Sequence, residues 1–545
     1  MSRQWAIAAL TLVALGAGPV GGAEENRTPA SEAGQSAIAR GEQAPHRGVF
    51  ELALTASPGF GNPYDDVEVQ VTLTRPGGDT VTVDGFFDGE TTWKARAYCD
   101  TLGEWRWKSS SNNAGLHGKS GRFKVVASPL PGKLRLHPDD RRQFAYDNGE
   151  WFLHIGDTGY RYVVNTEPKW QAYIDQAAQM GVNKVRTWTC RSRSGVEALF
   201  ADSRRSLDLP YWREMERRLL YALERHPHVI FELIPFGEDT PELLRYAAGD
   251  AASRRMARYA QARFSALPNV YWCVVNDRIF KDAKLPRAIN QIAHDMDARE
   301  PWGTLLTCHQ TRFSGYAFVD QPWSDMVLLQ DMDQVAGAIL LEYREKTNTP
   351  VINAEDRYEN HRPPGHPRYF FRRLMWGSLL SGGSATYGGG ATYEAFKKNP
   401  KVCGVQGYYD LCASGALKRG GDDFNRIHAF FKDYRLTLVG MTPADELAGG
   451  DPLRYKCIRG FSAVIVYLAN PTGKAPETDD ESPATPRVAL TVPAGTWHVL
   501  WFDPQEGGQG ARAGKPVSEG AVTLTAPGAG DWILLLRPAN PDGDP

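Results

Sequence analysis

Two acidic residues stand where apolar, β-rich segments of the sequence stop. Residues 269–277 run Asn-Val-Tyr-Trp-Cys-Val-Val-Asn-Asp and end at Asp277, and residues 350–355 run Pro-Val-Ile-Asn-Ala-Glu and end at Glu355. An acid that follows a hydrophobic strand lies where the strand leaves the core, which is where parallel α/β barrels carry their chemistry. Two carboxylates on different strands suit hydrolysis of a glycosidic bond, because one protonates the leaving oxygen and the other attacks or activates water.

A structural role would also account for either acid by itself. Each could cap the following helix or pair with a neighbouring arginine, Arg278 or Arg357, since buried ion pairs also place carboxylates at strand ends. The presence of two such acids in one succession of strands and helices favours catalysis.

The length, charge and composition of the chain limit the class of protein to which it can belong. A length of 545 residues predicts about three domains. A net charge of −2 without a basic run argues against a nucleic-acid partner. The seven cysteines form no Cys-x-x-Cys pair, and neither a His-Glu-x-x-His nor a Gly-x-Ser-x-Gly motif occurs. We therefore predict no metal, no cofactor, and neither zincin nor serine-hydrolase chemistry.

The cysteines themselves are expected to be structural. Cys190, Cys273 and Cys308 fall in predicted strand segments and should be small buried hydrophobic residues. Cys403 and Cys412 are close enough in sequence to be a candidate bridge, which spacing by itself does not establish.

The first 23 residues are typical of a signal peptide. Arg3 supplies the positive start, residues 6–18 the apolar core, and Gly21-Gly22-Ala23 the cleavage site. The apolar core is short for a membrane span, and no second long apolar segment follows. Residues 24–45, rich in Ala, Glu, Ser and Gly, are predicted to be a disordered leader. We expect a secreted or periplasmic protein with no membrane insertion.

The strand pattern predicts three folded domains. Short alternating strands indicate an N-terminal immunoglobulin-like β-sandwich at 46–128 and a C-terminal β-sandwich at 440–540. Between 134 and 435 strands and helices alternate, as in a parallel α/β domain. Eight strands are expected there, at 151–157, 182–188, 229–235, 271–277, 304–309, 326–330, 351–355 and 384–387. The predicted fold class is therefore multidomain α/β plus all-β, with a central (β/α)8 TIM barrel.

Several motifs together resemble the apiosidase-like glycoside hydrolases, similar to glycoside hydrolase family 140 within the large retaining barrel superfamily. The barrel motifs are Gly156-Asp157-Thr158 in the first strand, Asp277-Arg278 after the fourth, and Pro350-Val351, Glu355 and Tyr358-Glu359 in the seventh. The segment 84–89 with Trp93 looks like the β-domain that often precedes this barrel. Residues 501–504 look like the C-terminal domain of the collagen-binding type. The resemblance covers nearly the whole chain after residue 45.

The resemblance implies a retaining mechanism with Asp277 as acid/base and Glu355 as nucleophile. A general acid needs a raised pKa, which burial and a like-charged partner would provide for Asp277. Asn276 stands where the family usually has Gly, and Tyr160 where Trp is common. Because of these departures, specificity for apiose does not carry over, and we expect a terminal or branch sugar of a plant-type or other complex polysaccharide.

Residues at the exits of other strands are candidates for binding the sugar. They are Asn276, Asp157, Arg186, Trp188, His309, Gln330, Tyr358 and Tyr387. Asn276 is placed to hydrogen-bond the sugar 2-hydroxyl, whereas packing or support of another residue is an equal alternative for most of the others. Glu232 lies inside the third strand and is expected to be structural, and Glu359 is the rival nucleophile.

The predicted partner is an oligo- or polysaccharide, and the oligomeric state is left open. Two non-enzymatic readings compete with a hydrolase on this scaffold: a carbohydrate-binding protein without activity, and a matrix-adhesion protein. Retention of both acids argues against the first, and the absence of a protease motif argues against matrix processing.

Overall fold

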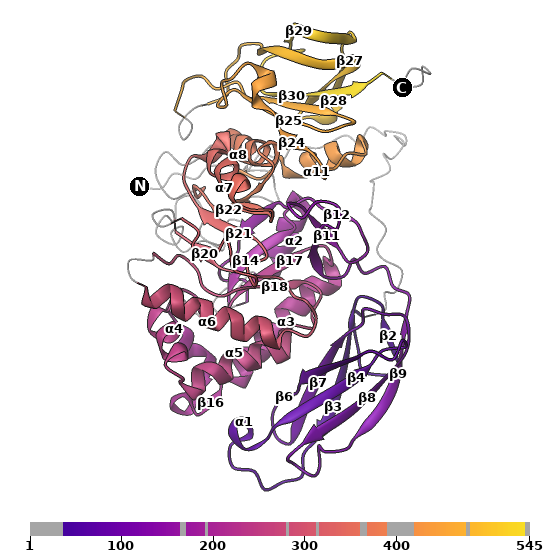
Figure 1. The fold of residues 1–545 in the computed structure, drawn as a ribbon, viewed down its shortest axis with the longest axis vertical. Helices are drawn as coiled ribbons and strands as arrows, with labels where there is room; N and C mark the ends of the chain where they lie inside the picture. Colours follow the sequence, from indigo (N-terminus) through magenta and orange to yellow (C-terminus); the bar gives the residue numbers. More distant parts are fainter. Residues whose placement is uncertain are drawn as a thin grey trace, which may run out of the picture. The chain divides into compact units, whose positions relative to one another are not determined.

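The computed structural model describes residues 36–163, 170–190, 194–279, 283–311, 315–359, 368–389, 419–475 and 480–539 (Figure 1), the side chains of 508–511 excepted. The predicted signal peptide, residues 24–35 of the predicted leader and the candidate Cys403–Cys412 bridge lie outside these residues. Within the described ranges, no helix is both long and apolar enough to cross a membrane.

The described end of the predicted disordered leader differs from the expectation, because it forms two strands. β1 (Ile38–Ala39) pairs in parallel with β3 (Val49–Thr55), and β2 (Gln43–Pro45) pairs in parallel with β9 (Ser120–Val126). Ala44 pairs with Val125 and is fully buried. The N-terminal domain therefore begins before residue 46.

Two sheets build the N-terminal domain. The first has the order β1-β3-β7-β6, with β7 (Thr92–Tyr98) and β6 (Phe86–Phe87). The second has the order β2-β9-β8-β4-β5, with β8 (Gly103–Ser111), β4 (Val69–Thr74) and β5 (Thr80–Asp84); a short helix, α1 (Pro63–Asp66), precedes β4. Phe50 on β3 stacks on Phe123 on β9 with 3.8 Å between ring centroids, so the sheets pack face to face.

The barrel is one sheet of parallel strands. Its order is β19-β18-β17-β14-β13-β23-β22-β21-β20, and every neighbouring pair is parallel. The strands are β13 (Gly156–Thr158), β14 (Lys184–Trp188), β17 (Ile230–Ile234), β18 (Val270–Cys273), β19 (Leu306–Thr307), β20 (His309–Gln310), β21 (Val327–Gln330), β22 (Val351–Glu355) and β23 (Ser384–Tyr387).

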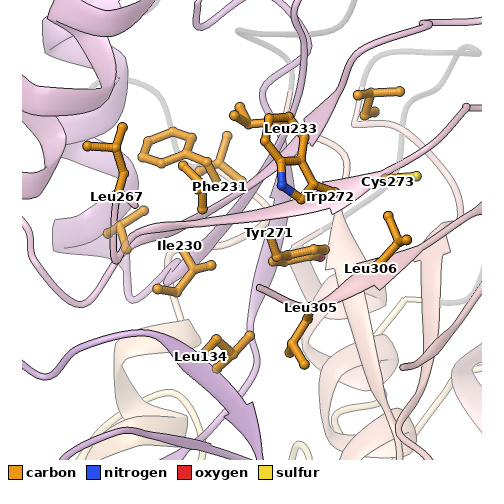
Figure 2. Close-up of a cluster of buried hydrophobic side chains, with 14 of the residues drawn as sticks. Leu134, Ile230, Phe231, Leu233, Leu267, Tyr271, Trp272, Cys273, Leu305 and Leu306 are labelled. Atoms are coloured by element: carbon orange, nitrogen blue, oxygen red, sulfur yellow. The ribbon is translucent and has the colours of Figure 1, made fainter. Parts of the chain in front are cut away.

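The fifth strand closes the barrel. It is interrupted at Cys308, so that β19 pairs with β18 while β20 pairs with β21. The nine strands therefore occupy the eight predicted positions of a closed ring. Figure 2 shows buried side chains contributed by β17, β18 and β19, a near-continuous apolar run that is typical of parallel strands. Cys190, Cys273 and Cys308 are fully buried, as predicted.

The first predicted barrel strand is divided in the structure. Trp151 and Phe152 form β12 (Trp151–Phe152), which pairs antiparallel with β11 (Phe144–Tyr146), itself paired with β10 (Leu134–Leu136). The rings of Tyr146 and Phe152 pack edge to face at 5.2 Å. Only Gly156 to Thr158 join the barrel as β13, because the aromatic residues before them pack in this separate sheet.

Helices cover the barrel strands. They are α2 (Trp170–Met180), α3 (Leu209–Arg225), α4 (Thr240–Ala247), α5 (Ala251–Phe264), α6 (Lys284–Arg299), α7 (Ala338–Lys346), α8 (Arg368–Leu380) and α11 (Phe424–Asp433). In α3, the Asp208 side chain accepts from the Tyr211 amide, Pro210 occupies the first turn, and Met215 and Leu219 lie on the buried face. The sequence pattern did not predict α4, α5 or α11.

Short elements complete the barrel loops. After β14 come η1 (Val196–Leu199), β15 (Phe200–Ala201), η2 (Asp202–Arg204) and β16 (Ser206–Leu207), and η3 (Gln334–Ala336) precedes α7.

The C-terminal strands form one antiparallel sheet of order β24-β25-β26-β30-β27-β28, with β29 also paired to β27. The strands are β24 (Thr442–Pro443), β25 (Tyr455–Arg459), β26 (Val464–Leu468), β27 (Arg487–Asp503), β28 (Gly507–Ala513), β29 (Val517–Thr525) and β30 (Trp532–Pro538), with η5 (Asp445–Ala448) before β25. Val466 and Leu534 belong to a core of this domain, whereas Ile465 and Leu535 pack into the cluster that includes the barrel. Alternation along β26 and β30 therefore buries both faces of the sheet.

A buried ionic cluster joins the N-terminal domain to the barrel. Arg96 on β7 contacts Glu51 at 2.5 Å and Glu216 on α3 at 2.8 Å. Arg263 on α5 contacts Glu216 at 2.6 Å and Asp88 at 2.9 Å. The N-terminal ionic cluster is defined as Glu51, Asp88, Lys94, Arg96, Glu216 and Arg263.

A second ionic cluster joins the barrel to the C-terminal domain. Arg372 on α8 donates to both oxygens of Asp531 at 2.8 Å, to Asp423 at 2.8 Å and to Glu481 at 3.0 Å. Arg368 also pairs with Asp423. The C-terminal ionic cluster is defined as Arg368, Arg372, Asp423, Glu481 and Asp531.

Candidate active site

The two predicted acids meet at the carboxyl ends of the barrel strands. Glu355 is the last residue of β22, and Asp277 lies four residues beyond β18. One carboxylate oxygen from each acid and one ring nitrogen of His309 all lie within 4.8 Å of one another. The structure thus brings together two of the strand-end acids and one of the predicted sugar-binding residues.

The chain reaches Asp277 through an irregular extension of the fourth strand. The Val274 amide donates to Thr307 at 2.9 Å, and the Asn276 amide donates to Gly237 at 2.8 Å. Asp277 itself has a left-handed backbone with φ of +45°, which is unusual for a residue with a side chain.

Glu355 is buried among hydrogen-bond donors. Tyr160 donates its hydroxyl to Oε2 at 2.8 Å, Arg186 donates Nη1 to the same oxygen at 3.3 Å, and Gln330 donates its amide to Oε1 at 2.7 Å. Burial and the nearby charge of Asp277 raise the pKa of Glu355 above its ordinary value, although Arg186, His309 and Tyr160 act in the opposite direction. The donors therefore stabilise an ionised carboxylate that burial opposes.

Arg186 and Asn276 form the floor beneath Glu355. Arg186 Nη1 also donates to the Ala354 carbonyl at 2.6 Å, and Nη2 donates to the Asn276 side chain. The Asn276 amide donates to the Tyr160 hydroxyl at 3.1 Å and to Glu238 at 3.1 Å. Arg186 and Asn276 are fully buried, so their observed role is to position neighbouring groups, and direct sugar contact by either stays a prediction.

Trp188 packs against Tyr160, the residue that donates its hydroxyl to Glu355. Its ring stacks on Tyr160 with 4.2 Å between centroids and 10° between planes, and it is fully buried. The structure therefore places Trp188 as a support of the tyrosine that contacts Glu355.

His309 faces Asp277. Its Nδ1 lies 2.9 Å from Asp277 Oδ1, and the backbone amide of Asp277 donates to the same nitrogen at 3.4 Å. His309 is fully buried on β20, whereas 11% of the Asp277 side chain is exposed. The contact holds the acid on one side and leaves it accessible on the other.

The two arginines considered as alternative partners of the acids bind other carboxylates. Arg278 contacts Glu238 at 3.0 Å, and Arg357 contacts Asp333 at 2.6 Å. The ion pair that Glu355 makes is instead with Arg186.

Gln330 and Asp157 are both tied into the strand ends. Gln330 accepts from Thr311 at 2.7 Å while it donates to Glu355. Asp157 accepts from Tyr173 at 2.7 Å and from the Gly389 amide at 3.0 Å. Burial raises the pKa of Asp157 to about 6 despite these donors. Asp157 thus fixes the start of the segment that follows β23.

Tyr358, Tyr387 and Glu359 lie where β22 and β23 end. Tyr358 is buried, and its backbone forms a parallel β-bridge with Gly388. The backbone amide of Glu359 donates to the Gly388 carbonyl at 2.9 Å. Glu359 accepts a hydrogen bond from the Gly420 amide at 2.6 Å. Burial raises the pKa of Tyr387 above its ordinary value, and the charge of Glu359 raises it further. The structure therefore places the rival acid beside Tyr387.

Glu232 has the buried structural environment that the sequence analysis expected. It contacts Lys184 at 2.5 Å and Arg186 at 3.3 Å, and Tyr271 donates to it at 2.9 Å. Burial would raise the pKa of Glu232, but Lys184 and Arg186 lower it to about 2.

Two residues of the network were not predicted from the sequence. Tyr160 was considered only as a departure from the family pattern, and Glu238 was not considered. Glu238 follows β17 by four residues, so the pattern that identified Asp277, an acid just after an apolar strand, was available for it too.

Asp277, His309 and Glu355 are also the one group in the described residues with three potential metal ligands close together. Both Glu355 oxygens already accept hydrogen bonds, and the Arg186 cation lies 3.3 Å from one of them. Because a cation would be repelled by this guanidinium, the arrangement fits an acid pair better than a metal site.

A parallel barrel with one carboxylate beyond its fourth strand and another at the end of its seventh is an arrangement that barrel-type glycoside hydrolases use. The family model described as "Apiosidase-like, catalytic domain" matches residues 138–418, and that of DUF5060, a domain of unknown function, matches residues 45–112. The chain therefore belongs to the apiosidase-like glycoside hydrolases.

Solved structures share the fold. An inferred glycoside hydrolase from Bacteroides vulgatus ATCC 8482 has a TM-score of 0.71 at 18% identity, with 91% of this chain and 100% of that chain covered. A family 5 glycoside hydrolase from the same organism has a TM-score of 0.57 at 14% identity, with 75% and 94% covered. The comparison with curated proteins found no match. The collagen-binding resemblance of the C-terminal domain stays a prediction.

Proposed function

We propose that the protein is an exported retaining glycoside hydrolase in which Asp277 is the acid/base and Glu355 the nucleophile. The observation that carries this proposal is the unlike surroundings of two carboxyl groups with oxygens within 4.8 Å of each other. Retention is associated with carboxyl groups about 5–5.5 Å apart, whereas inverting enzymes leave about 6.5–9.5 Å for a water molecule. The close approach therefore supports retention.

The hydrogen-bond partners support the division of roles. Glu355 accepts from three donors, which favours its ionised form. Asp277 Oδ1 faces His309 Nδ1 at 2.9 Å, and that nitrogen already accepts the Asp277 amide. Two acceptor atoms this close attract each other only when a proton lies between them, and Asp277 can act as the general acid when it is the group that holds this proton. Unequal protonation of two neighbouring carboxyls is the arrangement of a nucleophile and a general acid.

The proposed reaction has two steps. Glu355 attacks the anomeric carbon as the bond to the leaving oxygen breaks, and Asp277 gives that oxygen its proton. Water then attacks the glycosyl-enzyme, gives a proton to Asp277, and releases Glu355 as a carboxylate. Arg186, Tyr160 and Gln330 hold Glu355 in line for both steps.

The proposed substrate is a terminal or branch sugar of a plant-type or other complex polysaccharide, reached after export directed by residues 1–23. Family membership supports a carbohydrate substrate. Apiose is one candidate among several, because Asn276 and Tyr160 depart from the family pattern.

A screen of aryl glycosides and pectic oligosaccharides, apiosides included, tests the activity. We expect hydrolysis of at least one substrate, and the product first seen by proton NMR should keep the anomeric configuration. Inversion would refute the nucleophile role of Glu355. Tight binding without turnover would indicate the carbohydrate-binding alternative instead.

Variants separate the two roles. Glu355→Ala should lose activity on every substrate, and azide should restore turnover to give the inverted glycosyl azide. Asp277→Ala should lose most activity on poor leaving groups, and azide should then give the retained product. Glu359→Ala, in the segment that follows β22, is the matched control and should keep the mechanism. If Glu359→Ala is instead the inactive variant, the assignment is wrong.

A further inference from the structure

The barrel interior below Glu355 contains ionic side chains that the proposed reaction does not use. Lys184 and Arg186 are two residues apart on β14, so both point into the same side of the sheet. Glu232 lies beside Arg186 in the register of β17. All three are fully buried, in a position that barrels usually fill with branched aliphatic residues. Because buried ion pairs seldom increase stability over apolar packing, stability alone is a poor explanation for them.

The contacts form a line that ends at Glu355. Glu232 Oε2 meets Lys184 Nζ at 2.5 Å, and Glu232 Oε1 meets Arg186 Nε at 3.3 Å. The other end of the guanidinium faces the active site, where Nη1 lies 3.3 Å from Glu355 and Nη2 donates to Asn276. Glu232 therefore fixes the back of Arg186 while its front contacts the nucleophile.

The charges of this line balance only when Glu355 is ionised. Lys184 and Arg186 are then two cations opposite the two carboxylates of Glu232 and Glu355. Without Lys184, a single arginine would face both carboxylates. In a buried site of low dielectric, the excess negative charge would favour protonation of Glu355.

We propose that Lys184 and Glu232 are positioning residues that act on the nucleophile through Arg186. Glu232 orients the guanidinium, and Lys184 supplies the charge that keeps Glu355 ionised. This inference rests on the proposed role of Glu355 as nucleophile.

Few of the groups around this line of charges should change their protonation state together with Glu355. Burial lowers the pKa of Lys184 to about 8 although Glu232 opposes the shift, and burial lowers the pKa of His154 to about 3. Glu232, with a pKa lowered to about 2, stays ionised. The titratable groups that face the line from the strands and loops packed around it are His154, Tyr160, Tyr271, Cys273, Asp277, Cys308, His309 and Tyr358. The pKa values of Tyr160, Tyr271 and Cys273 are raised well above their ordinary values by burial, which keeps these groups neutral.

The test compares pH profiles of kcat/KM. Lys184→Met should move the acidic limb, which reports ionisation of Glu355, to higher pH by about one unit. Lys184→Met/Glu232→Gln removes one charge of each sign and should bring the limb back to within about 0.3 units of wild type. A merely structural pair would instead leave the limb in place and make the double variant at least as impaired as the single one.

Tyr271→Phe is the matched control. It removes a hydrogen bond from a neutral donor to the Glu232 oxygen that Lys184 also contacts. The acidic limb of the pH profile should therefore not move. Glu232→Gln alone should also leave the acidic limb unshifted, because buried Lys184 loses its counter-charge and becomes neutral. Its kcat should fall, because Arg186 loses the ion pair with Glu232 that orients the guanidinium. If Lys184→Met does not fold, Lys184→Gln takes its place with the same expected shift.

A second readout needs no substrate. A Glu355 pKa raised further in the folded protein adds a contribution to stability that is complete below the unfolded value and is lost as the pH rises through the folded value. The Tm of Lys184→Met should therefore fall relative to wild type between pH 5 and pH 7, and the double variant should not show this fall. If wild type hydrolyses no glycoside, the proposed function fails, and the Tm comparison still decides the charge coupling. An unshifted limb or parallel Tm curves would overturn the inference.

Discussion

The two ionic clusters that join the flanking domains to the barrel have different charge balances. The N-terminal ionic cluster has three cations and three carboxylates, and each carboxylate has a cation within 2.7 Å. In the C-terminal ionic cluster, Arg372 serves all three carboxylates, and Arg368 adds a second contact to Asp423. We call the first interface balanced because each carboxylate has a close cation of its own, and the second unbalanced because Asp531 and Glu481 share Arg372.

The balance decides whether the carboxylates stay ionised. Burial would raise the pKa values of Glu51 and Asp88, but the neighbouring cations lower both to about 2. In the C-terminal ionic cluster, burial and the hydrogen bond and charge of Asp531 raise the pKa of Glu481 to about 7. The same type of contact thus gives opposite pH dependence at the two interfaces.

The direction follows from linkage between protonation and folding. Carboxylates with pKa values lowered to about 2 contribute stability above their unfolded values of 4.5 and 3.8, and this is lost as pH falls toward 2. Glu481, raised from 4.5 to about 7, contributes stability below pH 4.5 that is lost as pH rises through 7. Between these limits the N-terminal interface is constant while the C-terminal one weakens.

The largest expected effect comes from the balanced cluster. Arg96→Met leaves Glu51 and Glu216 buried without their shared cation, so the free energy of unfolding in urea should fall by about 3–5 kcal/mol. Arg106→Met on the same domain removes an arginine with 75% side-chain exposure and should change it by less than about 0.5 kcal/mol. Equal, small effects would mean that the cluster adds nothing to stability.

A smaller and pH-dependent effect is expected in the C-terminal ionic cluster. Arg372→Met should cost about 2–4 kcal/mol of unfolding free energy at pH 8. At pH 5 the loss should be clearly smaller, since Glu481 and Asp423 can take up protons. Urea titrations at both pH values measure the difference. A loss of unfolding free energy that is the same at both pH values would contradict the proposed protonation of Glu481 and Asp423.

Glu481→Gln removes the titratable group of the C-terminal ionic cluster and therefore tests the difference between the two interfaces directly. The amide keeps a neutral side chain in place, so the C-terminal domain should no longer weaken between pH 4.5 and pH 7. Hydrogen exchange of β26 and β30 amides, compared with that of β7, reports the two interfaces separately. If wild type shows no weakening over this range, the pKa of Glu481 is not raised as described.

The smallest expected effect is on catalysis. Glu481 contacts Arg372, Gln505 and the Asp531 amide, so Glu481→Gln should keep kcat on an aryl glycoside within about twofold of wild type. A tenfold decrease would show that the C-terminal interface is coupled to the active site.

Local patterns predicted much of the fold because the barrel strands are short apolar runs bounded by polar residues. β22 runs from residue 351 to 355, as predicted, and the eighth strand agrees as well. The division of the first strand was not predictable, because the same aromatic run fits either a barrel strand or an antiparallel pair. Arg-rich α5 was missed because charged residues that face the N-terminal domain obscure its helical pattern.

The candidate acids were accessible from sequence because strand ends mark the barrel mouth. Their partners were harder to predict, since the Tyr160–Glu355 hydrogen bond joins residues 195 positions apart. Trp188 and Arg186 were correctly placed on β14, but their complete burial depends on how the neighbouring strands close over them. Closure of the ring, rather than any local motif, decides which strand-end residues remain accessible.

The left-handed backbone of Asp277 has an evolutionary consequence. A residue with a side chain loses about 1 kcal/mol in this conformation, which glycine adopts freely. Asp277→Gly should therefore be more stable than Asp277→Ala by about that amount, although neither has an acid. Natural selection for stability alone would favour glycine at this position. With Asp277 as the proposed acid/base, the aspartate exchanges this stability for activity, and selection should maintain it only while the carboxyl group is needed.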